Sequence, residues 1–150
     1  MLAITPADYQ YQDTYFAKCA SLLKPGGKAL IQAITIEDHR YQQALDSVDF
    51  IKRYIFPGSY IPCVSSMVAS AAQAGQLRLL DLQDIGDSYA KTIHAWRERF
   101  LSREADVLAL GYDRRFLRMW DFYLAYCEAG FLEESISDVH LLLGKERYPG

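Results

Sequence analysis

The sequence predicts an α/β fold with a small mixed sheet, and three stretches carry that prediction. The first, Lys28–Ile36, is nearly continuous in apolar and β-branched residues, as expected of a strand covered on both faces. Gln76–Ile85 and Ile136–Lys145 are two further predicted strands, and segments with helical periodicity separate all three. No repeat or linker interrupts the chain, so we expect residues 1–150 to form one domain.

Apolar residues recurring at three- and four-residue spacing predict five helices around these strands. They cover residues 11–23, 37–56, 63–75, 89–111 and 113–131. Pro25, Gly26 and Gly27 end the first helix and turn the chain into the first strand. The third is expected to be capped by Ser65 or Ser66, and the third and the last two to end at glycine.

Composition and charge exclude several classes of function. A net charge of −3 and an isoelectric point near 5.6 argue against nucleic acid as a partner, because phosphate binding needs a concentrated basic surface. The three cysteines stand far apart without a CxxC pair, so the sequence indicates neither a zinc site nor a disulfide framework. With no signal peptide or membrane-spanning run in the sequence, we expect a protein of the reducing cytoplasm.

The three histidines do not form a recognisable ligand set. His39, His94 and His140 are widely separated and belong to different predicted elements. Metal sites usually draw ligands from short, regular spacings, so we expect surface histidines and no metal.

Four separated stretches resemble a known family in residue type and in order: "YFAKCASLLKPGGKALIQAITI", "DFIKRYIFPGSYIP", "YAKTIHAWRERF" and "GYDRRFLRMWDFYLAYCEAGF". They are similar to the C-terminal half of the cyclopropane-fatty-acyl-phospholipid synthases and the related mycolic acid methyltransferases. The resemblance covers residues 10–145, and several separated motifs in the right order make it specific.

This resemblance implies the C-terminal portion of a Rossmann-like class I methyltransferase fold. Lys28–Ile36, Gln76–Ile85 and Ile136–Lys145 then correspond to the fifth, sixth and antiparallel seventh strands, with the seventh between the other two. The first four strands, which carry the glycine loop and the acidic residue that hold S-adenosylmethionine, are expected to be absent. The turn Lys24–Lys28 precedes a strand instead of following one, so we expect no cofactor bound by this chain alone.

The resemblance also implies a site for chemistry on an unsaturated phospholipid acyl chain, with bicarbonate as the base. Tyr89 matches the family tyrosine that contacts bicarbonate, and Ile34 the residue whose backbone helps to hold it. Gln32 stands where many members have histidine, which leaves a hydrogen-bond donor without a titratable group. The family's glutamate and cysteine of this site are expected to precede Met1.

Each of these pointers also has a purely structural interpretation. Tyr89 could cap or pack a helix, and Gln32 on a buried strand needs a partner in either case. The aromatic residues of the last two helices could line a lipid pocket or form core. The segment 51–62, with Lys52 and Arg53 beside aromatic residues, could dock weakly at an anionic membrane surface.

Two functional classes therefore stay open. The chain is either the C-terminal part of a cyclopropane-synthase-like lipid methyltransferase, inactive without an N-terminal part, or a remnant that binds lipid or oligomerises. Without a fourth strand, Ala29–Ile36 would be an apolar edge with unpaired amides, which seeks a partner. We accordingly expect a homo-oligomer or association with the missing part.

Overall fold

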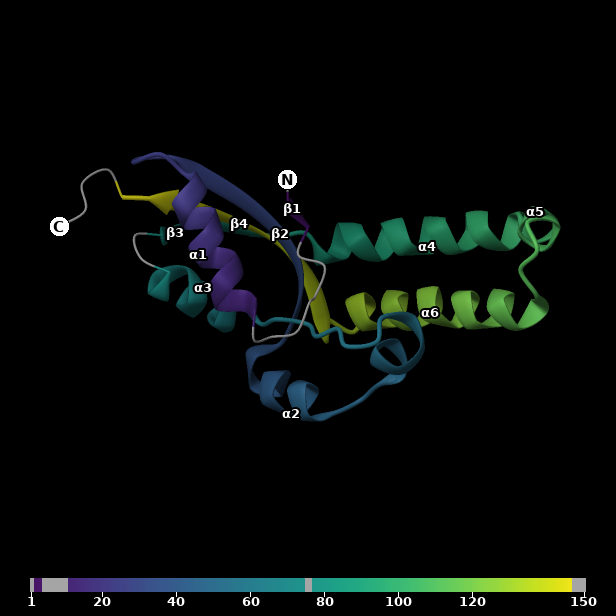
Figure 1. Ribbon diagram of the computed structural model, residues 1–150. Coiled ribbons are helices and arrows are strands. Elements are labelled where there is room, and N and C mark those ends of the chain that lie inside the picture. The colour runs from purple at the N-terminus through teal and green to yellow at the C-terminus, as the bar shows by residue number, and fades with distance from the viewer. Residues whose placement is uncertain (1, 4–10, 75–76, 147–150) are drawn as a thin grey trace. The chain divides into compact units, whose positions relative to one another are not determined.

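The computed structural model describes residues 2–3, 11–74 and 77–146, and these fall into two compact units (Figure 1). The first unit combines the chain up to Ile85 with the segment from Asp138 onward. The second runs from Gly86 to Ser137. Each unit is considered by itself below.

A four-stranded sheet forms the centre of the first unit. Its strands are β1 (Leu2–Ala3), β2 (Lys28–Ile36), β3 (Leu77–Asp84) and β4 (Ile136–Lys145), in the order β1-β2-β4-β3. β4 is antiparallel to β3, with Leu77 opposite Lys145 and a bulge between Leu79 and Asp81. The predicted position of the last strand, between the first and second long strands, is therefore confirmed.

Two helices, α1 (Gln12–Leu22) and α3 (Val64–Gln73), supply the core that covers one face of this sheet. The strands alternate in exposure, so every second side chain points to this core. The cluster consists of Phe16, Ala20, Ile31, Ala33, Met67, Ala71, Leu77, Val139, Leu141 and Leu143. The ammonium group of Lys145 joins β4 to the end of α1 by donating to Ala20 O at 2.7 Å and Leu23 O at 3.0 Å.

The edge of the sheet differs from the sequence prediction. We expected Ala29–Ile36 to be an unpaired edge, but β1 pairs with it in parallel, with Leu2 opposite Ile31 and Ala3 opposite Gln32. Ile36 N–H also donates to Pro62 O at 3.0 Å. A two-residue strand therefore covers the middle of β2, and the expectation of a wholly unpaired edge was wrong.

The predicted helix over residues 37–56 was also wrong, because the chain forms three short pieces there. These are a 3-10 helix at Asp38–Arg40, α2 (Tyr41–Asp46) and a π-helix at Ile51–Ile55. Ser47 has extended backbone angles, and the Asp49 carboxylate accepts a hydrogen bond from Lys52 N–H at 2.8 Å. Serine and aspartate compete for backbone groups in this way, and here they end the helix.

The cap of α3 comes from a residue that the sequence did not suggest. We expected the Ser65 or Ser66 side chain to cap it, but Cys63 is the N-cap residue and makes no side-chain cap hydrogen bond. Asp38 instead accepts from Ser65 N–H at 3.0 Å and also from the Ser65 hydroxyl. The predicted stop at Gly75 lies outside the described residues.

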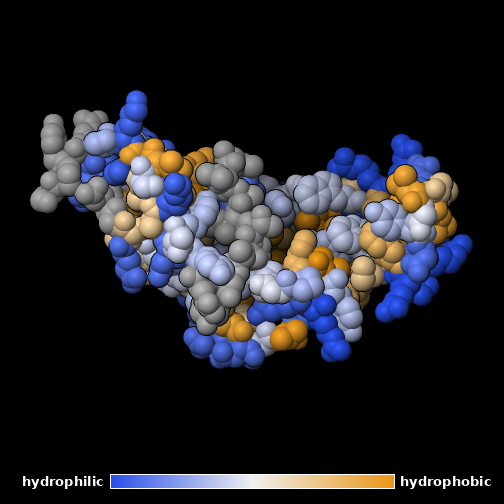
Figure 2. All heavy atoms as spheres, viewed as in Figure 1, coloured by the Kyte–Doolittle hydropathy of each residue, from blue (hydrophilic) through white to orange (hydrophobic). Residues whose placement is uncertain are grey.

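The second unit is a helical hairpin of α4 (Gly86–Ser102) and α6 (Arg114–Leu132), with the short α5 (Glu104–Ala109) at its end (Figure 1). The single helix predicted over residues 89–111 is broken at Arg103, which leaves the helical angles at φ −110° and ψ 20°. The last helix passes through Gly130 instead of ending there. Figure 2 shows hydrophobic and strongly hydrophilic residues side by side on the end of this hairpin.

Candidate functional site

Two of the three predicted site residues lie on the sheet face opposite the core. Gln32 and Ile34 alternate along β2 with the buried Ile31 and Ala33, so both project from the second face. Ile34 is 38% exposed and Leu30 on the same face is 44% exposed. This face therefore offers apolar surface with one amide between two aliphatic side chains.

The partner of Gln32 is a buried carboxyl on β4. Gln32 Nε2 donates to Asp138 Oδ2 at 2.6 Å, and Asp138 is 0% exposed. Burial raises the pKa of Asp138, opposed by the hydrogen bond from Gln32 and the nearby His140, while Asp84 raises the pKa further. Asp138 Oδ1 has no hydrogen-bond partner among the residues that the structure describes.

Sequence reasoning missed Asp138. The stretch "ISDVHLLLGK" predicts a strand with a buried run from Val139 to Leu143, and that pattern gives no role to the acidic residue before the run. A carboxylate within a strand expected to be buried is rare unless it is paired, and that rarity was the available signal. Its pairing with Gln32, 106 positions away, required the strand order.

Tyr89, the third predicted site residue, belongs to the first turn of α4 in the second unit. Its ring lies 5.0 Å from that of Phe131 and 6.2 Å from that of Trp96, measured between centroids. The ring therefore helps to pack α4 against α6, in line with its structural interpretation. Tyr89 is partly exposed.

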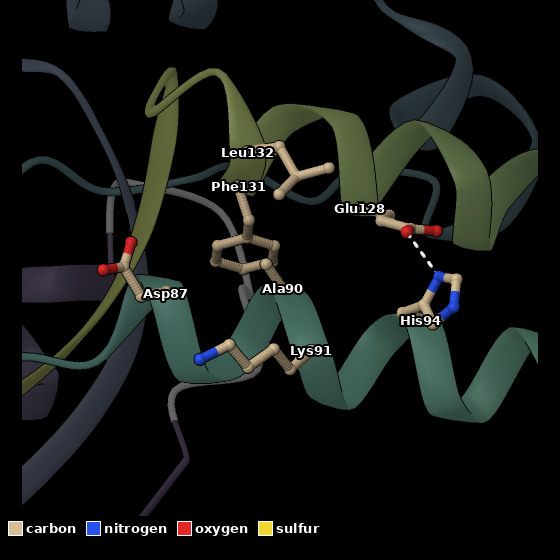
Figure 3. Close-up of a pocket in the computed structure, with 7 residues that line it drawn as sticks. All are labelled: Asp87, Ala90, Lys91, His94, Glu128, Phe131 and Leu132. Atoms are coloured by element: carbon tan, nitrogen blue, oxygen red, sulfur yellow. Dashed lines mark hydrogen bonds and ion pairs between the residues drawn. The ribbon is translucent and has the colours of Figure 1, made fainter.

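A shallow pocket of about 370 Å³ lies between α4 and α6 (Figure 3). His94 Nδ1 lies 2.7 Å from Glu128 Oε1, and His94 Nε2 lies 3.6 Å from Glu98 Oε1. His94 is largely exposed, as expected of a surface histidine. The lining consists of Asp87, Ala90, Lys91, His94, Glu128, Phe131 and Leu132. The pocket is thus lined by charged side chains of both signs and by apolar side chains. Tyr89 is not among the lining residues.

The predicted aromatic stripe is only partly core. In α6 the buried side chains include Leu117, Leu124 and Phe131, whereas Phe116 and Trp120 are half-buried. Tyr112, Phe116 and Trp120 form a stacked row, with centroids 4.3 Å and 5.6 Å apart. Burial, with Cys127 adjacent, raises the pKa of Tyr123 above its usual range.

The glycine turn before β2 does not fit a nucleoside cofactor. The turn before β2 is a structural connection in which Gly27 N–H donates to Lys24 O at 2.8 Å and Gly27 O accepts from Lys145 N–H. It precedes a strand, whereas a nucleoside cofactor needs a glycine turn after one. No group of three or more potential ligands among the described residues could hold a metal ion.

The segment expected to contact a membrane is largely engaged with the protein itself. The Lys52 ammonium group donates to Ser47 O at 2.8 Å and to Ala44 O. The Arg53 guanidinium lies 5.4 Å from the ring of Tyr54, and Tyr60 is buried. Within the described part of the chain, helices long and apolar enough to cross a membrane are absent.

The sheet order and the antiparallel last strand define the C-terminal portion of a class I methyltransferase fold. A cyclopropane synthase from Mycobacterium tuberculosis superposes with a TM-score of 0.81 at 23% identity, covering 92% of this chain and 51% of that one. A mycolic acid cyclopropane synthase in complex with SAH and CTAB also gives 0.81, at 21% identity and with the same coverage. At these identities the likeness shows the fold alone.

Sequence comparison gives the family. The model of the mycolic acid cyclopropane synthetase family matches residues 3–141, a range that contains all four motifs quoted from the sequence. The chain belongs to this family of S-adenosylmethionine-dependent lipid methyltransferases.

Two curated relatives match most of the chain. The tuberculostearic acid methyltransferase of Mycobacterium tuberculosis is 40% identical over 128 residues, which are 85% of this chain and 30% of that protein. The cyclopropane-fatty-acyl-phospholipid synthase of Escherichia coli is 32% identical over 133 residues, which are 89% of this chain and 32% of that protein. The chain thus spans about a third of the length of the curated relatives it matches.

Proposed function

We propose that this chain supplies the C-terminal, acyl-binding part of a cyclopropane-synthase-like methyltransferase that modifies an unsaturated phospholipid acyl chain. The observation that carries the proposal is the family match over residues 3–141 on a sheet with the order β1-β2-β4-β3. S-adenosylmethionine, when bound, supplies the methyl group. Because the glycine turn of this chain precedes β2 instead of following a strand, we assign the cofactor to a further polypeptide segment.

The roles proposed for the site residues combine the family resemblance with the surroundings of each side chain. The exposed aliphatic side chains Leu30 and Ile34 are suited to contact an acyl chain, which is apolar along its whole length. Gln32, placed between them and held by Asp138, presents a fixed amide to a reacting centre. Methyl transfer to a double bond creates positive charge on carbon, so a base must take up a proton. The resemblance supplies bicarbonate as the proposed base and assigns it contacts from the Ile34 backbone and, separately, from the Tyr89 hydroxyl.

The direct test is methyl transfer by a completed enzyme. The chain would be joined to the preceding N-terminal part of the 40% identical Mycobacterium tuberculosis relative and given radiolabelled S-adenosylmethionine with unsaturated phospholipid vesicles. We expect label in the lipid with the joined protein and none with either part by itself. Fully saturated phospholipid is the matched control. A folded, cofactor-binding joined protein that leaves unsaturated lipid unlabelled would contradict the proposal.

A second candidate, a lipid-binding or oligomerising module, is favoured by the exposed leucines of the sheet. Leu30, Leu79, Leu80 and Leu82 are each 37–44% exposed in a chain that buries its core leucines almost fully. Apolar surface of this kind associates with other surfaces. The oligomerising form of this candidate predicts a homodimer by light scattering at high concentration, and a strictly monomeric species would exclude that form.

Membrane contact of this otherwise cytoplasmic part is proposed through Tyr54 and Phe56. Their side chains are 51% and 44% exposed, next to Arg53. One or two basic residues contribute roughly 1 kcal/mol each near an anionic surface, so the contact would be weak and salt-sensitive. Co-sedimentation with anionic vesicles at low salt, lost in the Phe56→Ser variant, would support it. Equal co-sedimentation of the wild-type protein and Phe56→Ser would contradict a membrane-binding role for this segment.

A further inference from the structure

The pair Gln32–Asp138 is unusual because a carboxyl group is buried on the sheet face that bears the candidate site. Asp138 is 0% exposed, one of its oxygens accepts from Gln32 at 2.6 Å, and the other has no partner among the described residues. Burial of an acid with half of its acceptor capacity unused costs folding free energy. A feature that costs stability beside a candidate site is a pointer to function.

The hydrogen bond to Asp138 also determines which way the Gln32 amide points. An amide has a donor end and an acceptor end, and a carboxylate accepts only, so the Gln32 nitrogen must face Asp138. The carbonyl Oε1 is then directed away from Asp138. A short bond to a charged acceptor holds this orientation more firmly than a neutral partner would.

We propose that Asp138 is a positioning residue that fixes the Gln32 amide on the second face of the sheet, with its nitrogen toward β4 and its carbonyl away from it. The inference rests on the proposed methyltransferase function, in which the fixed carbonyl orients the reacting groups beside the acyl chain. Asp138 is enclosed by protein and acts only through Gln32.

The proposal has a pH dependence whose sign is fixed. The groups that face Asp138 are Gln32 on β2, His140 on its own strand and Asp84 on β3. Because burial raises the pKa of Asp138, the folded state binds its proton more tightly than the unfolded chain does. The contribution of Asp138 to the free energy of unfolding is therefore fully present below the ordinary aspartate pKa. It falls as the pH rises through the raised pKa of Asp138 in the folded state. Activity should show the opposite trend, because a protonated Asp138 gains an O–H donor that can bind the Gln32 carbonyl and reverse the amide, whereas the ionised carboxylate only accepts.

The Asp138→Asn variant separates a positioning role from a structural one. Asparagine has the same shape without the buried charge, so we expect a higher Tm than wild type at pH 8, with the difference narrowing toward pH 4. In the joined enzyme the same variant should lower kcat by about tenfold or more, with KM little changed. The reason is that the Gln32 amide can then rotate and exchange the positions of its nitrogen and oxygen. Because Asp138 acts only through Gln32, adding Asp138→Asn to a Gln32→Ala variant should cause no further loss of kcat. A parallel loss of Tm and activity, or additive losses in the double variant, would overturn the proposal.

A second measurement on this chain by itself does not depend on catalysis. Hydrogen exchange of side-chain amides by NMR should show the Gln32 amide protons protected in wild type and fast in Asp138→Asn. Gln42, which donates to Asp46 at 3.2 Å on the exposed α2, is the matched control and should exchange fast in both proteins. If the joined enzyme is inactive but the Gln32 amide is protected from exchange, the methyltransferase proposal fails, whereas the inference that Asp138 fixes this amide is supported. If Gln32 exchanges as fast as Gln42, the positioning role is refuted.

Discussion

At the scale of single residues, Tyr89 serves packing first, whatever else it does. Its ring contacts those of Trp96 and Phe131, which joins the start of α4 to the end of α6. Tyr89→Ala should destabilise the chain by about 2 kcal/mol through lost aromatic contact, less than for a fully buried ring. Tyr89→Phe keeps these ring contacts and should cost about 1 kcal/mol or less. Chemical denaturation of the three proteins checks both values.

The activity of Tyr89→Phe in the joined enzyme distinguishes the two interpretations of this residue. If the hydroxyl helps to hold the base, methyl transfer should fall strongly while the melting curve barely moves. Full activity in Tyr89→Phe would leave Tyr89 with a packing role and remove it from the proposed site.

Lys145 is a second residue whose contribution is measurable. Its ammonium group donates to two carbonyl groups, Ala20 O and Leu23 O, at the end of α1, where the helix dipole also favours a positive charge. Lys145→Met keeps the aliphatic stem and should lower the free energy of unfolding by about 1–2 kcal/mol. Lys18→Met, at an exposed position on α1, is the control and should be near neutral. Equal effects of the two substitutions would show that the cap contributes nothing.

At the scale of elements, two glycines with equally crowded surroundings should respond differently to alanine. A Cβ at Gly27 would lie 2.8 Å from Lys24 O, which is backbone held in the turn before β2. A Cβ at Gly144 would meet Leu80 Cδ1 at 2.7 Å, but that is the end of a partly exposed side chain that can rotate away. We expect Gly27→Ala to cost about 1–3 kcal/mol and Gly144→Ala less than half as much. Thermal melts of the two variants side by side would contradict this if Gly144→Ala were the less stable.

The elements that sequence predicted well are those fixed by a continuous apolar run. β2, β3 and β4 appear within a residue or two of their expected bounds. The apolar run of β2 predicted a strand covered on both faces, and that part was wrong, because Leu30 and Ile34 on its second face are exposed. Their order came from the family resemblance, since pairing between strands over 100 residues apart leaves no local signal.

The features that the sequence could not predict are of two kinds. Some are helix breaks caused by local hydrogen bonds and backbone angles, and others are contacts between residues far apart in the chain. Asp49 ends a helical pattern by accepting from Lys52 N–H, and Arg103 departs from helical angles within one. Periodicity continues across both breaks, so counting apolar residues cannot find them. Asp138 illustrates the distant case, because its significance appears only beside Gln32. The three candidate site residues came from the resemblance, and their roles stay predictions.

At the scale of the whole molecule, the central claim is that this chain holds the acyl side of a methyltransferase and leaves S-adenosylmethionine to another segment. In the described residues, β1 is the edge strand of the sheet and pairs with β2. The two curated relatives are about three times as long as the region that matches this chain. A cofactor site of this fold class needs strands on that side.

The most direct measurement is titration calorimetry of S-adenosylmethionine into the purified chain and into the joined protein. The account predicts no binding heat with the chain by itself and clear saturable heat with the joined protein. Saturable binding by the chain alone would contradict the claim that the cofactor is held elsewhere. Absence of heat in a folded joined protein would contradict the claim that the chain completes a methyltransferase.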